Sequence, residues 1–473
     1  MANYTDQQIA SIVDRVIGRL AKDGAVGVGP TIHNPTFGAK DGVFPDADSA
    51  VAAARIAFEQ VGKTPLETRR KAIEAMRQTG RRLTNDISRM AVEETGLGRV
   101  ADKINKNLLV ANKTPGMELV VPTGHSGDHG LTIDERAPYG VICSITPCTN
   151  ATETILNNAI SMLSGGNTVV FNVHPSAKNV NNYFVRELNQ AMTAVGYPAN
   201  TLCSIGQPTI KSAGALMNHP GVRMVVVTGG PAVVKAAMAT GKKCIAAGPG
   251  NPPALVDETA DLAKAARDIG AGHSLDNNIV CIIEKVVVAV SSIADKLKEE
   301  FGRTGAYLLN DRDVAKLEKV ILDDNHINRK FVGKNVSVIL KEIGINVSDD
   351  VRFALCEVDE AHPFVQLEQL MPILPMFRVA SAQAGIEAAL RVEHGFFHTS
   401  TCHSQNINVL SDMARAVNTS IFVKNGPSYA GLGMGGEGYT SWTIAGPTGE
   451  GLTTSHTFTR KRRCTLVDAF RIC

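Results

Sequence analysis

Four short stretches of the 473-residue chain carry residue types that could do chemistry. The first ends at Asn150, in a turn between an apolar run and a helical pattern, and such loops line the ligand crevice of parallel sheets. The side-chain amide of Asn150 could donate hydrogen bonds to an oxyanion. It could equally cap the helix expected to begin near Ala151. The residues alone leave both roles open.

The second stretch places two glycines and a proline directly after an apolar run. Pro231 suits the first position of a helix, where free N–H groups can bind a phosphate. Thr228, Gly229 and Gly230 are therefore candidate phosphate-binding residues. The pattern is weak by itself, because no GxGxxG follows a first strand and many such turns carry glycine for geometry alone.

The other two stretches hold a cysteine and a group of histidines. Cys281 lies among apolar β-formers, where a cysteine is usually a small core residue, so only its context can make it a nucleophile. The segment with His394, His398 and His403 is dense enough to suggest a metal site. Its composition favours extended chain, which would separate the first two histidines by about 13 Å, so we expect no metal.

The elements that must position these residues alternate between β-branched runs and helical patterns, which is typical of doubly wound parallel sheets. Residues 46–118 read as helical scaffold, with helices at 51–61, 65–85 and 87–95. A first α/β region begins at Gly140 and a second at about Pro252. The expected strands are 141–146, 167–173, 202–205, 222–227, 279–283, 286–290, 336–339 and 407–409, with helices at 152–163, 177–194, 209–217, 260–269, 293–301, 311–321 and 384–392.

Three segments fall outside these regions. Residues 1–22 have apolar positions at helical spacing, which predicts an amphipathic helix, and residues 23–30 read as a flexible linker. The apolar face of this helix could pack on the rest of the chain or on a partner protein, and the flexible linker favours a partner. Residues 119–136 and 439–473 are too small for a core of their own, so we expect them to pair with each other and against another subunit.

Composition excludes several classes of function. Lys+Arg 48 and Asp+Glu 46 leave a net charge of +2, and aromatic residues are 5%, which argues against nucleic-acid binding. No apolar run approaches the roughly 20 residues of a membrane span, and the first residues lack the apolar core of a secretory signal. Nine cysteines without a CxxC pair argue against a disulfide framework or a four-thiolate zinc site. We therefore expect a cytoplasmic protein.

Taken together and in their order along the chain, the motifs of this sequence resemble those of the aldehyde dehydrogenase superfamily, from about Val43 to Cys473. The resemblance is carried by 137–142, 145–147, Asn150, 164–169, 227–230, Cys281, Glu368, Pro372 and Pro375. Four further stretches, 247–253, 393–404, 431–438 and 447–463, resemble the CoA-acylating branch that converts acetaldehyde or propionaldehyde in bacterial microcompartments.

The resemblance implies two doubly wound α/β domains plus a small β oligomerisation arm, in a tetramer or dimer of dimers. It also implies that residues 1–22 are an encapsulation peptide that docks on shell or core proteins. The implied parts are a dinucleotide-binding domain (31–118 and 137–248), a catalytic domain (249–438) and the arm (119–136 and 439–473).

The resemblance also implies site roles. Cys281 matches the nucleophile and Asn150 the oxyanion amide, while Glu368 matches the acid that holds the nicotinamide ribose. Thr146, Pro147, His174, Thr228, Gly229 and Gly230 match the cofactor-binding turns. His174 stands where hydrolytic relatives keep a lysine near the adenosine ribose, which leaves NAD and NADP both open, although the branch generally works with NAD.

One departure from the hydrolytic relatives bears on the reaction. They place a general-base glutamate 34 positions before the nucleophile, and here that position is Ala247. A thioester at Cys281 would then persist until CoA arrives, with His398 and His403 as candidates for proton removal from CoA. We expect NAD-dependent, CoA-acylating oxidation of a short aldehyde, propionaldehyde foremost; a hydrolytic enzyme with another base and an inactive scaffold are the alternatives.

Overall fold

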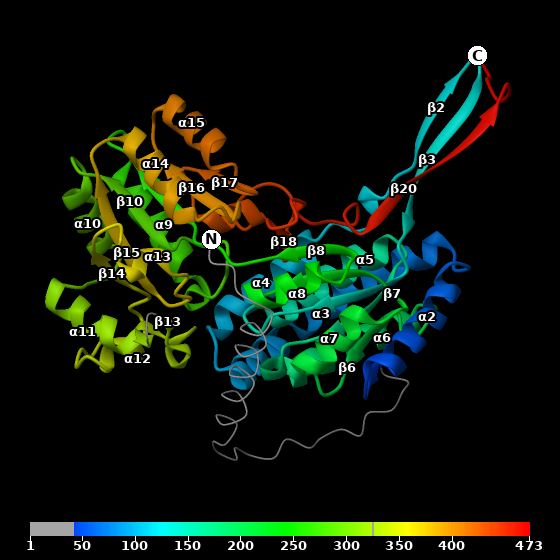
Figure 1. The fold of residues 1–473 in the computed structure, drawn as a ribbon, viewed down its shortest axis with the longest axis horizontal. Helices are drawn as coiled ribbons and strands as arrows, with labels where there is room; N and C mark the ends of the chain where they lie inside the picture. The colour runs from blue at the N-terminus through cyan, green and yellow to red at the C-terminus, as the bar shows by residue number, and fades with distance from the viewer. Residues whose placement is uncertain (1–41, 324–325) are drawn as a thin grey trace. The chain divides into compact units, whose positions relative to one another are not determined.

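The computed structural model describes residues 42–323 and 326–473. The compact unit that begins at Gly38 contains two large sheets with helices packed on them and a three-stranded sheet near the C-terminus (Figure 1). The amphipathic helix and the linker expected within residues 1–30 lie outside the described residues. No helix in the described ranges is long and apolar enough to cross a membrane.

The first lobe is built on six parallel strands in the order β1-β6-β5-β4-β7-β8. Successive strand residues point to opposite faces. In β4, Ile142 enters a core shared with α3, α5 and α6, whereas Cys143 enters a core shared with α2, α7 and α8. The bounds are β1 (Val43–Phe44), β4 (Val141–Ile145), β5 (Thr168–Asn172), β6 (Leu202–Ile205), β7 (Val222–Thr228), β8 (Lys243–Ala247), α2 (Ala47–Val61), α3 (Leu66–Thr95), α4 (Val100–Lys113), α5 (Ala151–Ser164), α6 (Lys178–Ala194), α7 (Ile210–Asn218) and α8 (Pro231–Met238).

The second lobe repeats this design on seven parallel strands in the order β11-β14-β15-β10-β9-β16-β17. In β10, Val288 packs with α14 and α15, and Val287 packs with α9 and α10. The bounds are β9 (Pro253–Val256), β10 (Val286–Val290), β11 (Tyr307–Leu308), β14 (Ala354–Glu357), β15 (Ile373–Val379), β16 (Thr399–His403), β17 (Ile421–Lys424), α9 (Leu262–Ser274), α10 (Ala294–Arg303), α11 (Asp311–Ile321), α12 (Val336–Lys341), α13 (Pro363–Gln366), α14 (Ala382–Glu393) and α15 (Ile407–Val417).

The expected α/β fold with parallel sheets is therefore confirmed, but several elements differ. Residues 336–339 and 407–409, expected as strands, lie in α12 and α15, because a short apolar run fits a buried helix as well as a strand. The two helices expected at 65–85 and 87–95 are the single helix α3. Residues 279–283 form turns instead of a strand.

The histidine-rich segment is also less extended than its composition predicts. His394 ends α14 in the left-handed region at φ 60°, and Phe397 is left-handed at φ 52°, so only residues from Thr399 onward form a strand. In the described ranges, no group of three or more His, Cys, Asp and Glu side chains is arranged to hold a metal ion.

The two extended pieces pair with each other as we expected. β2 (Thr123–Gly127) and β20 (Thr459–Val467) flank β3 (Gly130–Pro138) in an antiparallel sheet, which we call the arm sheet. Residues 440–458 lie apart from it and are largely buried, with Trp442 and Phe458 in the core of the first lobe. Of the C-terminal piece, only β20 pairs in the arm sheet.

Two helical glycines give a matched test of this packing. A Cβ at Gly80 in α3 would lie 2.6 Å from Cδ2 of Leu156, which is fully buried in α5, whereas a Cβ at Gly214 in α7 would meet nothing within 4 Å. We expect Gly80→Ala to lower the free energy of unfolding by about 1–3 kcal/mol through overpacking. Gly214→Ala should raise it by about 0.5–1 kcal/mol.

Urea unfolding of both variants, followed by circular dichroism, measures these changes. A stabilised Gly80→Ala protein would contradict the close approach of α3 and α5, the helix that follows Asn150.

Candidate functional site

Cys281 lies in a turn between the 3₁₀ helix η3 (Leu275–Asn278) and β10. The turn is directly preceded by three residues with positive φ: Asp276 at 49°, Asn277 at 55° and Asn278 at 67°. Few residues other than Asp and Asn tolerate such φ values. These three residues reverse the chain and prevent the strand that the apolar residues predict. Cys281 remains partly exposed, although the side chains on either side of it are buried. The turn therefore keeps Cys281 out of a strand and leaves part of the residue exposed.

The turn is held from behind by the buried ammonium of Lys285. Its Nζ donates to the carbonyl oxygen of Asn278 at 2.7 Å, to Oδ1 of the same residue at 2.6 Å and to the carbonyl oxygen of Val280 at 3.1 Å. Burial lowers the pKa of Lys285 to about 8, against the attraction of Glu368 and Cys281. Lys285 thus fixes the backbone that leads into Cys281.

Glu368, His398 and Cys281 lie around the same residue, Gly250. A Cβ at Gly250 would lie 2.8 Å from the carbonyl oxygen of Cys281 and 3.0 Å from Cγ of His398. The N–H of Gly250 donates to Oε1 of Glu368 at 3.4 Å. The structure therefore brings together the predicted nucleophile, the predicted ribose-binding acid and one of the two predicted proton-transfer histidines.

The thiol of Cys281 is held in its protonated form. Burial, and to a smaller extent the carboxylate of Glu368, raise the pKa of Cys281 to about 12, while Lys285 and Lys106 oppose the shift. Burial also lowers the pKa of His398 to about 4, with Lys285 contributing. His398 is accordingly neutral near pH 7; its Nδ1 hydrogen-bonds with Oγ1 of Thr399, and its buried Nε2 has no partner in the described part of the chain.

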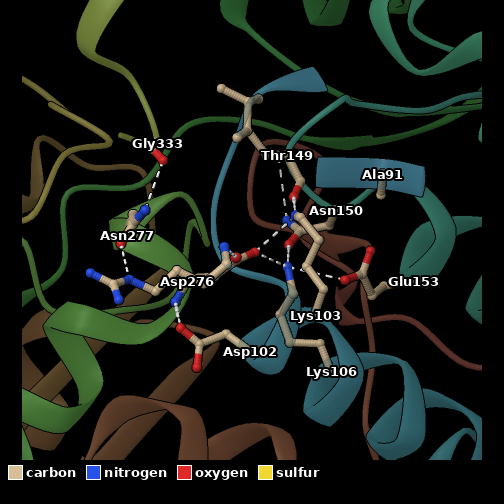
Figure 2. A network of polar contacts seen from close by, with 12 residues as sticks. Ala91, Asp102, Lys103, Lys106, Thr149, Asn150, Glu153, Asp276, Asn277 and Gly333 are labelled. Atoms are coloured by element: carbon tan, nitrogen blue, oxygen red, sulfur yellow. Dashed lines mark hydrogen bonds and ion pairs between the residues drawn. The ribbon is translucent and has the colours of Figure 1, made fainter. Parts of the chain in front are cut away.

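Asn150 directly follows the loop after β4 and precedes α5, but its side chain makes no capping hydrogen bond. Its Oδ1 accepts a hydrogen bond of 2.8 Å from Nζ of Lys106, and its Nδ2 has one weak contact, 3.4 Å from Oγ1 of Thr149 (Figure 2). Of the two roles that the sequence left open, capping of α5 is wrong. The amide N–H groups are available to another acceptor.

The predicted cofactor-binding residues follow the C-terminal ends of neighbouring strands β5, β4 and β7. Oγ1 of Thr146 is buried without a partner among the described residues, and Pro147 next to it is partly exposed. Gly230 precedes α8 with no side-chain cap, and a Cβ there would meet nothing within 4 Å. Free helix N–H groups beside open space fit the phosphates of a dinucleotide.

Three other cofactor candidates have partners of their own. Oγ1 of Thr228 lies 3.1 Å from Oγ1 of Thr443, and the N–H of Gly229 donates to the carbonyl oxygen of Ala247. His174, after β5, hydrogen-bonds through Nδ1 with Oγ of Ser176 at 2.7 Å. Burial and nearby Arg329 lower the pKa of His174.

His403 does not join the group around Cys281. It ends β16, five residues after His398, so the two lie about 16 Å apart at the rise of a strand. Its surroundings include Asp268 and Lys264, and burial lowers its pKa to about 4. His394 hydrogen-bonds with the carbonyl oxygen of Gln366.

Sequence reasoning missed Lys106, Asp276 and Lys285. A lysine in an amphipathic helix is normally solvated, so the position of Lys106 in α4 gave no sign of burial. In the sequence, Asp276 and Lys285 are distinguished only by lying within five positions of Cys281, which does not indicate a role for either.

The model of the aldehyde dehydrogenase family matches residues 30–309. The acetaldehyde dehydrogenase (acetylating) EutE of Salmonella typhimurium is 47% identical over 438 residues, which cover 91% of this chain and 93% of the relative.

Two solved structures are also similar. The Rhodopseudomonas palustris propionaldehyde dehydrogenase, with bound CoA and an acylated cysteine, is 47% identical, with a TM-score of 0.89 over 90% of this chain and 98% of that one. A propionaldehyde dehydrogenase from the Clostridium phytofermentans fucose utilisation microcompartment is 45% identical, with a TM-score of 0.90 over 91% and 100% of the two chains.

The charges around Cys281 predict how its reactivity depends on pH. In the protein alone, we expect the rate of Cys281 alkylation by iodoacetamide to rise steadily up to at least pH 10, because the pKa is about 12. Glu368→Gln removes a negative charge that raises this pKa, so alkylation at pH 9 should become several-fold faster. Peptide mass spectrometry distinguishes Cys281 from the other cysteines.

The matched control is Glu360→Gln. The carboxylate of Glu360 pairs with Arg391, so its removal should leave the alkylation rate of Cys281 unchanged. An alkylation rate that levels off near pH 8, or that falls in Glu368→Gln, would contradict the assigned environment of the thiol.

Proposed function

Because the chain belongs to the aldehyde dehydrogenase family, we propose that it oxidises a short aliphatic aldehyde to an acyl-CoA with reduction of NAD. The observations that carry this proposal are a partly exposed Cys281, an Asn150 amide whose NH₂ group makes only one weak contact, and alanine at position 247. The acetylating relative and the CoA-bound propionaldehyde dehydrogenase support acyl transfer to CoA.

In the first half-reaction, the thiol of Cys281 first gives up its proton to water, which the positive charge of a bound nicotinamide would favour. The resulting thiolate attacks the carbonyl carbon of the aldehyde, and the C=O electron pair moves to oxygen. The amide of Asn150 and the backbone N–H of Cys281 donate to this oxyanion. Each donor of such a site lowers the barrier by roughly 3 kcal/mol. The product of this step is a thiohemiacetal on Cys281.

NAD supplies the hydride acceptor that converts the thiohemiacetal into a thioester. Thr146, Pro147 and the turn 228–230 would hold its phosphates and adjacent groups, and His174 would lie near the adenosine ribose. The partly buried carboxylate of Glu368 would accept hydrogen bonds from the nicotinamide ribose. Burial raises the pKa of Glu368, while Lys285 opposes the shift. A nicotinamide ribose held by Glu368 would lie close to Cys281, because Gly250 contacts both residues.

In the second half-reaction, the thiolate of CoA attacks the thioester carbonyl, and the thiolate of Cys281 leaves. Ala247 ends β8 and is 3% exposed, so this position offers no carboxylate to activate water. His398 is neutral, and its Nε2 is free to take the proton of the CoA thiol. His403 has no part in this step, because it lies at the far end of β16.

We also propose that the protein acts as an oligomer inside a bacterial microcompartment, with residues 1–22 docking on shell or core proteins. The arm sheet supports the oligomer, since β2 is fully exposed along an unpaired edge. The microcompartment relative supports the location.

A reporter fused to residues 1–22 should concentrate in compartments; a diffuse signal in shell-producing cells would contradict this role.

The reaction itself is tested by omitting CoA. With propionaldehyde and NAD, we expect one equivalent of NADH per site without CoA and continuous turnover with CoA. Acetaldehyde and butyraldehyde, assayed in parallel, define the chain length. Equal steady-state rates with and without CoA would indicate a hydrolytic enzyme, and no NADH from any of the three would indicate an inactive scaffold.

Two substitutions test the assigned roles. Cys281→Ala should abolish the NADH burst while leaving NAD binding and thermal stability intact. Asn150→Ala should lower kcat by about 10²- to 10³-fold, because it removes one oxyanion donor. A loss below threefold for Asn150→Ala, or residual turnover of Cys281→Ala, would contradict these assignments.

A further inference from the structure

Lys106 is fully buried at the centre of a cluster of polar groups between α4, α5 and η3 (Figure 2). Its Nζ lies 2.8 Å from Oδ1 of Asn150, 2.6 Å from Oδ2 of Asp276 and 3.1 Å from Oε1 of Glu153. The same ammonium lies 5.4 Å from the ring centroid of Trp442. Lys106 thus contacts both the residue proposed as oxyanion donor and the 3₁₀ helix that leads to Cys281.

We propose that Lys106 is a positioning residue for the reaction: it orients the amide of Asn150 toward the substrate and ties it, through Asp276, to the segment that carries Cys281. This inference rests on the roles proposed above for Asn150 and Cys281.

The orientation follows from donor and acceptor counts. A carboxamide can turn over and exchange its oxygen and nitrogen with little change in shape. An ammonium group has donors but no acceptor, so only the oxygen of Asn150 can face Lys106, and the NH₂ group must face away. Without Lys106, the amide could present its oxygen to the oxyanion, where it would repel instead of donating.

The link to the nucleophile runs through Asp276. Its Oδ2 accepts from Lys106 and, at 2.9 Å, from Lys103, and its Oδ1 accepts from the backbone N–H of Arg99 at 2.7 Å. Asp276 lies five residues before Cys281, in the left-handed stretch that reverses the chain. One carboxylate therefore fixes the start of the nucleophile segment relative to α4.

The charges of the cluster are matched, which allows its burial. Burial by itself would lower the pKa of Lys106, but Asp276 and Glu153 raise it overall. Burial would likewise raise the pKa of Asp276, but Lys103 and Lys106 lower it overall. Both groups of the pair are ionised near pH 7, so the ammonium keeps its donors.

Lys103 supplies a matched control. It is also buried and bonds to Asp276, but its other contact is the carbonyl oxygen of Thr149 at 3.3 Å, and it makes no hydrogen bond to the side chain of Asn150. Lys103→Met and Lys106→Met each remove one cation and leave Asp276 with the other. A purely structural role predicts similar effects of the two, whereas a positioning role predicts a loss only for Lys106→Met.

The probe is trifluoroacetone, whose carbonyl carbon accepts the Cys281 thiolate and whose oxygen becomes an oxyanion, without need of NAD or CoA. ¹⁹F NMR measures the affinity of this adduct in the full chain, and Cys281→Ala identifies its site. We expect the affinity to fall 10- to 100-fold in Lys106→Met and in Asn150→Ala, and less than threefold in Lys103→Met. In the Asn150→Ala background, Lys106→Met should cost less than threefold more.

Equal losses in Lys103→Met and Lys106→Met, or independent losses in the double variant, would overturn the inference. So would the lack of an adduct in the unmodified protein. If Lys106→Met does not fold by thermal melting, Lys106→Gln takes its place, since it is neutral and no longer selects one amide orientation. An adduct with the expected pattern in a protein that makes no NADH would uphold the inference and overturn the proposed function.

Discussion

The contact between the carboxylate of Asp276 and two buried lysines is the interaction on which the site depends. The lysines belong to α4 of the first lobe, and the carboxylate belongs to the segment before Cys281. Space around it is so limited that a Cβ at Gly98, which has φ 77°, would lie 1.9 Å from Oδ1 of Asp276. The nucleophile segment is thus placed by an ion pair as well as by apolar packing of Val280, Ile282 and Ile283 on the first core.

Such an arrangement gains precision at a cost in solvation. Removing charges from water is unfavourable, and an ion pair in the interior compensates only when its remaining donors and acceptors are satisfied. Here Asp276 has three donors, and Lys106 has three oxygen partners. A hydrophobic contact could hold the segment equally firmly, but it could not select which end of the Asn150 amide faces the substrate.

Four strands of the first sheet could be predicted from sequence because they are short, mostly apolar runs rich in β-branched residues, such as 222–227. In the second sheet, the apolar run 286–290 could be predicted and is β10, but β16 could not, since it is made of Thr, Ser, Cys and His, and the more apolar 407–409 opens a helix. Cys281 and Asn150 were found by resemblance, and only the geometry shows that the side chain of Asn150 does not cap α5. Lys106 could not be found at all, because burial of a lysine depends on partners 44 and 170 positions away.

The high pKa of the Cys281 thiol also bears on the durability of the protein. Peroxide attacks a thiolate far faster than a thiol, and oxidation beyond the sulfenic acid is irreversible in most proteins. A sulfur held protonated by burial and by Glu368 is therefore shielded from oxidants while no ligand is present. The same surroundings that make the resting residue a poor nucleophile thus preserve it between catalytic cycles.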